Sequence, residues 1–127
     1  MSSPTGVPTI SARDAAAEIE SARTATGVPE PLLVDVRERH EFANQRATGA
    51  ILLPISEFVA RHEELPKDRP LRMICAAGSR SAQATAFLLQ RGWTDVKNVT
   101  GGMMAWSGAG LPTKGGRPAP DEGAIPG

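Results

Sequence analysis

The stretch from Cys75 to Ser81 is the part of the sequence whose residue types best suit chemistry. It reads Cys-Ala-Ala-Gly-Ser-Arg-Ser, and Cys75 is the only cysteine among the 127 residues. An apolar run over residues 71–74 precedes the cysteine, and a segment of helical period follows it. In open α/β sheets, sites gather beyond the carboxyl ends of the strands. The sequence therefore predicts a cysteine that ends a strand and faces the start of a helix.

The small residues after Cys75 predict a tight loop whose backbone N–H groups turn toward the sulfur. Gly78 permits backbone angles or a close approach that a Cβ would obstruct, while Ala76, Ala77 and Ser79 leave the loop open. The following helix adds the positive end of its dipole. Because these groups favour an anion, we expect Cys75 to be partly or mostly thiolate. A lone cysteine after an apolar strand is commonly an inert core residue, but this loop favours the functional interpretation.

The elements that position this loop are predicted from short apolar runs that alternate with helical periods, a pattern typical of a parallel sheet covered by helices. Strands are predicted over residues 7–10, 32–36, 50–53, 71–74 and 96–99. Ser11 is expected to cap a first helix that ends before Gly27 and Pro29, and Ser56 to cap a later short one. The other helices are predicted over residues 38–43, from after residue 79 to about 90, and over 103–106, after the Gly101-Gly102 pair.

The composition changes beyond Pro112, because residues 113–127 are rich in Gly and Pro and offer almost nothing to bury. We expect a mobile tail over 113–127, a short N-terminal extension over 1–8 and one domain over 9–112.

Composition and charge exclude several classes of function. Fourteen basic and fourteen acidic residues cancel, and aromatic residues are few, so no nucleic-acid partner is expected. A single cysteine cannot form an internal disulfide or a multi-cysteine metal site. No apolar run is long enough to cross a bilayer, and the first residues lack the features of a signal peptide. We therefore expect a cytoplasmic protein with no membrane partner.

The loop resembles the active-site motif Cys-x-x-Gly-x-Arg-Ser of the single-domain rhodaneses. Three further segments agree with that family in order and separation: Asp35-Val36-Arg37-Glu38, Gly49-Ala50-Ile51 with Pro54, and Gly101-Gly102 through Ala105-Trp106 to Gly110-Leu111-Pro112. The match spans about Thr9 to Pro112. The resemblance implies a rhodanese-like α/β fold, with a central, mostly parallel five-stranded sheet and helices on both faces.

The resemblance also implies sulfurtransferase activity. The Cys75 thiolate would take sulfur from thiosulfate or a persulfide donor, keep it as a persulfide on the anion-binding loop of residues 76–81, and pass it to a thiophilic acceptor such as cyanide or a thiol. No metal or organic cofactor is required. The expected partners are a small-molecule sulfur donor and a small or protein thiol, and the expected state is a monomer or a weak homodimer.

Three alternatives remain beside this prediction. The first is a non-catalytic binding or sulfur-relay module with the same fold. The second is a phosphatase or arsenate reductase, disfavoured because related phosphatases place one more residue between their cysteine and arginine than the four that separate Cys75 from Arg80. The third is a Cys–His hydrolase, which is poorly supported because His40 and His62 have no defined spacing from the cysteine.

Most of the charged residues near the loop have two candidate roles. Arg80 either attracts an anionic donor or holds the loop by pairing with Asp35 or Glu38, and the structural role is slightly favoured. Arg37 either helps bind the donor's sulfonate oxygens or is a solvated surface residue. Asp35 is expected to hold loop backbone or Arg80 rather than to act as a general base. Arg46 stands where the family often has His, which leaves the local packing open and could bring another positive charge near the site.

Hydroxyl and aromatic side chains complete the candidate set. Ser79 and Ser81 either bond the sulfur or cap the helix, and capping is favoured. Trp106 either walls the pocket entrance or packs in the core, and core packing is the commoner role, as it is for Met103 and Met104. Trp93 is expected to serve packing alone.

Overall fold

One parallel sheet forms the centre of the molecule. The computed structural model describes residues 6–127, so residues 1–5 of the predicted N-terminal extension lie outside the described residues. The strand order is β1-β6-β5-β2-β4, and every neighbouring pair is parallel. The strands are β1 (Thr9–Ile10), β6 (Val96–Val99), β5 (Leu71–Ile74), β2 (Leu32–Asp35) and β4 (Ile51–Leu52). The predicted α/β class and five-stranded sheet are confirmed, and the sheet is entirely parallel.

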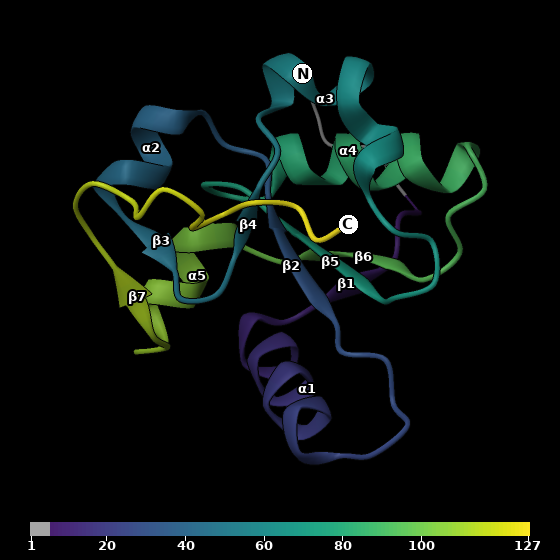
Figure 1. The fold of residues 1–127 in the computed structure, drawn as a ribbon, viewed down its shortest axis with the longest axis horizontal. Helices are drawn as coiled ribbons and strands as arrows, with labels where there is room; N and C mark the ends of the chain where they lie inside the picture. Colours follow the sequence, from purple (N-terminus) through teal and green to yellow (C-terminus); the bar gives the residue numbers. More distant parts are fainter. Residues whose placement is uncertain (1–5) are drawn as a thin grey trace.

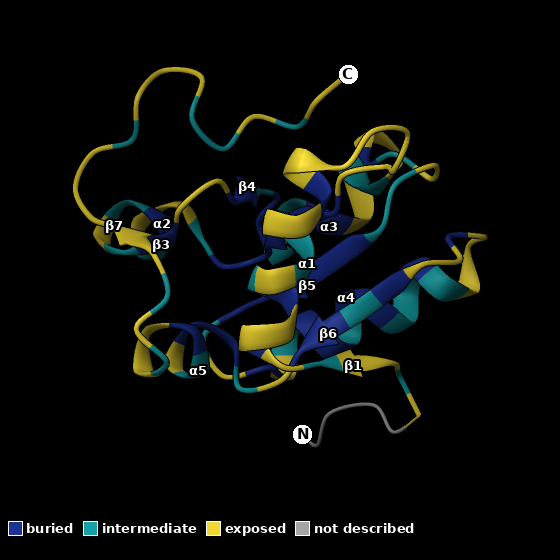
Figure 2. Cartoon of the chain, turned by 90° about the horizontal axis from the view of Figure 1, so that it is seen from below, coloured by how far each residue is buried: buried dark blue, intermediate teal, exposed yellow. Residues whose placement is uncertain are grey.

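Helices cover both faces of the sheet, as Figure 1 shows. Helix α1 (Ala12–Thr24) lies on one face, where it contacts α5 (Gly102–Gly108), whereas α3 (Ile55–Arg61) and α4 (Ser79–Gln90) lie on the other. Strands β2 and β5 are buried along their whole length, which explains their nearly unbroken apolar sequences. Figure 2 shows β5 in the dark blue of buried residues. Leu33 packs with the α1 and α5 cluster, and its neighbour Val34 with the α3 and α4 cluster.

The helix starts show which of the predicted caps form. The Ser11 side chain accepts a hydrogen bond from the Asp14 N–H at 3.0 Å, so the predicted cap of α1 is confirmed. The predicted cap of α3 is wrong, because Pro54 occupies the N-cap position. Ser56 lies within the first turn of α3, where its hydroxyl donates to Glu38 at 2.8 Å. A 3-10 turn, η1 (His62–Glu64), continues the chain after α3.

The C-terminal segment lies against the domain, which differs from the mobile tail expected there. Strand β7 (Thr113–Lys114) pairs antiparallel with β3 (Arg46–Ala47), which follows helix α2 (Arg39–Asn44). Further on, the Gly123 carbonyl accepts a hydrogen bond from the Leu52 N–H at 2.8 Å, and Ile125 packs against the core. Figure 1 shows this yellow segment running past α2 and β4. Composition missed the contact because it depends on partners elsewhere in the chain.

Within residues 6–127, no helix has both the length and the apolar character needed to cross a membrane.

Candidate active site

Cys75 directly follows β5, between the ends of β2 and β6, and its side chain faces the start of α4. The residue is 1% exposed. Its Sγ accepts a hydrogen bond from the Gly78 N–H, with 3.1 Å between nitrogen and sulfur. Gly78 is the N-cap residue of α4 and has a φ of 111°, a left-handed conformation that strains residues with a Cβ. The glycine therefore allows the loop to aim its amide at the sulfur.

Ser81 provides the second polar contact to the sulfur. Its Oγ lies 3.2 Å from Sγ and is buried inside the first turn of α4. The favoured capping role of Ser81 is wrong, because Gly78 is the N-cap residue and Ser81 contacts the sulfur instead. Ser79 is exposed at the start of the same helix. Among the described residues, Gly78 is the only one of the loop amides at 76–80 whose hydrogen bond reaches the sulfur.

Asn98, on β6, is a functional candidate that the sequence interpretation missed. Its Nδ2 donates to the Gly78 carbonyl at 3.1 Å, and its Oδ1 accepts from the Ser81 hydroxyl at 2.6 Å. The residue is buried in a strand that pairs on both sides. An amide in such a strand must find partners, so a polar residue between Val96 and Val99 was a usable signal.

Helix α5 fixes the other side of the loop. The N–H groups of Met103 and Met104 donate to the carbonyls of Cys75 and Ala76 at 2.7 and 3.1 Å. A Cβ on Gly102 would lie 2.3 Å from the Cys75 carbonyl oxygen, and the φ of Gly102 is +53°. Gly102 therefore permits a contact that no other residue type would allow without displacement. This contact is the physical reason for the second glycine of the Gly101-Gly102 pair.

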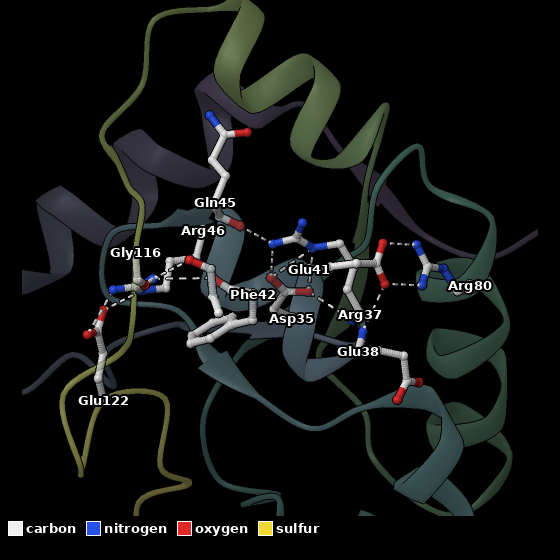
Figure 3. A network of polar contacts seen from close by, with 11 residues as sticks. Asp35, Arg37, Glu38, Glu41, Phe42, Gln45, Arg46, Arg80, Gly116 and Glu122 are labelled. Carbon is white, nitrogen blue, oxygen red and sulfur yellow. Dashed lines mark hydrogen bonds and ion pairs between the residues drawn. The ribbon is translucent and has the colours of Figure 1, made fainter.

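Arg80 holds the loop through a carboxylate that the sequence interpretation did not name. Its two terminal nitrogens donate to Glu41 on α2 at 2.8 and 3.0 Å (Figure 3). The hydrogen bonds from Arg80 lower the pKa of Glu41 from 4.5 to about 2, and the pair raises the pKa of Arg80. The favoured structural role agrees with this geometry, but neither Asp35 nor Glu38 is the partner.

Asp35, at the end of β2, pairs with Arg37 rather than with Arg80. Arg37 donates from Nε and Nη2 to the carboxylate at 2.8 to 3.1 Å, and from its backbone N–H at 2.9 Å. Its Nη2 also donates to the Gln45 carbonyl at 2.6 Å. Both side chains are buried, so Arg37 is not the solvated surface residue that one interpretation expected.

An open cleft of about 490 Å³ lies beside the cysteine loop. Its lining comes from the loop, the region after β2 and helix α5: Arg37, Gln45, Ala76, Met103, Met104, Ser107 and Gly108. Met104 is 72% exposed, whereas Met103 is buried. Trp106 does not line this cleft. It packs in the core and donates from Nε1 to the Pro112 carbonyl at 2.9 Å.

Arg46 adds no free charge to the site. It is 3% exposed and pairs with Glu122 of the C-terminal segment, and it donates to the Gly116 carbonyl at 2.7 Å (Figure 3). Its guanidinium also lies 5.4 Å from the centre of the Phe42 ring. The departure from the family's His is therefore coupled to the docking of residues 113–127.

The remaining aromatic candidates serve packing. Trp93 is buried and donates from Nε1 to the Pro66 carbonyl at 3.1 Å. His62 packs edge-on against Phe87, and its Nδ1 faces the Val59 carbonyl at 2.8 Å. None of these contacts of Trp93 and His62 involves Cys75.

Comparison with known proteins agrees with this architecture. A sulfurtransferase from Allochromatium vinosum is 43% identical over 81 residues, which cover 64% of this chain and 76% of that protein. The thiosulfate sulfurtransferase GlpE from Actinobacillus succinogenes is 35% identical over 81 residues, which cover 64% of this chain and 73% of that protein. A rhodanese-related protein from Thermoplasma volcanium superimposes with a TM-score of 0.73 at 32% identity, covering 84% of this chain and 97% of that one.

The family model described as "Rhodanese-like domain" matches residues 11–109, which include β2, the cysteine loop and α5. With the parallel sheet, the loop after β5 and the relatives named above, this match shows that the chain belongs to the rhodanese-like domain family.

Proposed function

We propose that this protein is a sulfurtransferase that carries sulfane sulfur as a persulfide on Cys75. The observation that carries the proposal is the position of Sγ at the carboxyl end of β5, where the Gly78 amide and the Ser81 hydroxyl reach it at 3.1 and 3.2 Å. Hydrogen bonds to an anionic acceptor are the stronger kind, so the Gly78 amide favours a sulfur that bears negative charge, and so does the Ser81 hydroxyl when its proton turns to the sulfur. An inert core cysteine needs neither.

The first half-reaction loads the enzyme. The Cys75 thiolate attacks the outer sulfur of thiosulfate, the sulfur–sulfur bond of the donor breaks, and sulfite leaves with the bonding electron pair. The product is Cys75–S–S⁻. The donors aimed at the sulfur are in place before the reaction and stabilise the negative charge that the terminal sulfur keeps.

The second half-reaction unloads it. A thiolate or cyanide attacks the terminal sulfur, and Cys75 leaves as a thiolate, which restores the starting state. Because the chain has one cysteine, no internal thiol resolves the persulfide, and the sulfur passes to another molecule. Sulfur is carried covalently throughout, so the proposed reaction uses no metal or organic cofactor.

Arg37 is the side chain best placed to recognise an anionic donor. It lines the cleft that Ala76 also lines, directly after the cysteine. Asp35 and the Gln45 carbonyl occupy Nε and Nη2, and among the described residues none accepts from Nη1. We assign this edge of the guanidinium to the sulfonate oxygens of thiosulfate.

Intact-protein mass spectrometry tests the proposal. Incubation with thiosulfate should add about 32 Da, one sulfur atom, and a small thiol should remove it. Cys75→Ser should show no gain. A wild-type protein that takes up no sulfur from thiosulfate or from a small persulfide would contradict the proposal. In that case, normal cellular function of a folded Cys75→Ala variant would identify a binding module instead.

A further inference from the structure

Four groups around Cys75 form a closed ring of hydrogen bonds. The Gly78 N–H donates to Sγ, and Sγ lies 3.2 Å from the Ser81 hydroxyl. Ser81 lies 2.6 Å from Oδ1 of Asn98, and Nδ2 of Asn98 donates back to the Gly78 carbonyl at 3.1 Å. Both groups that touch the sulfur are therefore held by one side chain, that of Asn98.

The direction of each bond in the ring follows from its chemistry. The Gly78 carbonyl can only accept, so the Asn98 amide presents its Nδ2 there and its Oδ1 to Ser81. Oδ1 can only accept, so the single hydroxyl proton of Ser81 points to Asn98 at 2.6 Å. A lone pair of Oγ then faces the sulfur, which suits a neutral thiol that donates its S–H to Ser81.

An anionic sulfur reverses one of these bonds. A thiolate or a persulfide anion has no proton to give, so it gains a second donor beside the Gly78 N–H only if the Ser81 hydroxyl turns from Asn98 to the sulfur. The movement is a rotation of the hydroxyl about the Cβ–Oγ bond. Because it leaves no proton between Oγ and Oδ1 of Asn98, these two oxygens move apart from 2.6 Å. Asn98 keeps its bond to the Gly78 carbonyl during this rotation and so holds the loop.

We propose that Asn98 is a positioning residue for Cys75, and that the Ser81 hydroxyl is the movable donor that it aligns. In the thiol state the proton of Ser81 is bound to Asn98, and in the thiolate and persulfide states it is bound to sulfur. The persulfide part of this inference rests on the proposed sulfurtransferase function, while the thiolate part does not. Asn98 acts through Ser81 and Gly78, without touching the sulfur itself.

The charged groups around the loop do not change with this switch. Arg80 at the start of α4 is paired with Glu41 of α2, and Arg37 after β2 is paired with Asp35. A substitution at Ser81 or Asn98 leaves both ion pairs in place. A change in the pH dependence of Cys75 reactivity in these variants therefore reports the hydrogen-bond ring.

The test is a double-mutant cycle with Ser81→Ala, Asn98→Ala and the combined variant. Two rates are measured for each: alkylation of Cys75 by iodoacetamide, and the mass gain from thiosulfate. Loss of a hydrogen bond to a charged acceptor predicts roughly a tenfold decrease or more for Ser81→Ala. Loss of the side chain that aligns Ser81 and Gly78 should slow Asn98→Ala to a similar extent. Because Asn98 acts through Ser81, the double variant should react about as slowly as Asn98→Ala alone, rather than at the product of the two effects. The alkylation-versus-pH profile of Ser81→Ala should move to higher pH, because this variant lacks the hydroxyl that donates only to the anionic sulfur.

Thr85→Val is the matched control. Thr85 lies one turn further along α4, is buried, and donates to the Ser81 carbonyl at 2.7 Å without contacting the sulfur. Thr85→Val removes a buried hydroxyl of the same helix, so this variant shows how much perturbed packing alone changes the rates. Rates and pH profile should remain those of the wild type, and thermal unfolding of every variant shows whether it is folded.

Three results would overturn the inference: an Asn98→Ala variant that reacts like the wild type, multiplicative effects in the double variant, or an unmoved pH profile of Ser81→Ala. If the wild type gains no sulfur from thiosulfate, the proposed function fails, but the alkylation measurements still decide the role of Asn98. If an Asn98→Ala variant does not fold, the Ser81→Ala and Thr85→Val pair decides the donor role of Ser81, and Asn98→Ser replaces Asn98→Ala in the cycle once thermal unfolding has shown that this variant is folded.

Discussion

Arg80 directs both terminal nitrogens of its guanidinium to the carboxylate of Glu41, at 2.8 and 3.0 Å. Glu41 also accepts from the Glu38 N–H at 3.0 Å in the capping box that begins α2. One carboxylate thus joins the start of α2 to the cysteine loop. The arginine of the loop serves as a brace, because both of its terminal nitrogens are occupied by Glu41.

Replacing Glu41 by Gln should lower stability at neutral pH by about 1 kcal/mol, a reduced value because solvent screens side chains that are 25% and 34% exposed. Gln retains the capping-box acceptor and loses only the charge. The Arg80 hydrogen bonds lower the pKa of folded Glu41 to about 2 from 4.5. The contribution is therefore complete above pH 4.5 and is lost as pH falls toward 2. Thermal unfolding of both proteins across this range measures it, and a difference independent of pH would contradict the prediction.

Substitution of Gly102 by Ala should displace α5 from the cysteine loop. The added Cβ would lie 2.3 Å from the Cys75 carbonyl, at a left-handed φ, so we expect a loss of about 2 kcal/mol or more and slower sulfur loading. Gly108→Ala is the control, because a Cβ at this last residue of the same helix meets nothing within 4 Å. Denaturant unfolding and mass gain from thiosulfate measure the two effects. Equal behaviour of the two variants would exclude the steric explanation.

Arg37→Ala should be strongly destabilising, because it leaves the Asp35 carboxylate buried without its partner. The side chains are 7% and 0% exposed, and breaking such a pair costs about 3–5 kcal/mol. Removing both charges with Asp35→Ala and Arg37→Ala should recover part of that loss, since no unpaired charge remains. Denaturant unfolding of the three variants completes the cycle. If Arg37→Ala lowers the free energy of unfolding by no more than the loss of a surface ion pair would, the buried pair is not required for the fold.

A chain that stops after Pro112 should unfold at a lower temperature, by roughly 5 °C or more. Truncation removes Glu122 and the Gly116 carbonyl, and Arg46 then keeps its buried charge with the carbonyl of Phe42 as its main acceptor. Lys114→Ala is the comparison, because that side chain is exposed and its Nζ lies 4.0 Å from Glu122 Oε2, which is a weak contact. Differential scanning calorimetry distinguishes the two. An unchanged melting temperature on truncation would show that the docked segment contributes nothing to stability.

Much of the fold was predictable because local signals and tertiary packing agree. The buried runs of β2 and β5, the Ser11 cap and the position of Cys75 after β5 are all properties of short segments. Gly78 was predictable for the same reason, since its left-handed conformation is a requirement of the turn itself.

The partners of the charged residues were not predictable in this way. Which carboxylate meets Arg80 depends on the rotation of α2, a short helix that places Glu41 rather than Glu38 against the loop. Arg46 and Glu122 are 76 residues apart, and neither shows in its own neighbourhood that it has a partner. Asn98 carried a signal as a polar residue in a buried strand, but its partners became known only when β6 was placed beside the start of α4.

The bond between the Leu52 amide and the Gly123 carbonyl has a consequence for self-association. β4 is the outermost strand on its side of the sheet, and an uncovered strand of this kind offers amides to a second molecule. Gly123 occupies one of those amides and so reduces the number of donors that the edge offers to a second molecule. Without residues 113–127, edge-to-edge association should increase with protein concentration.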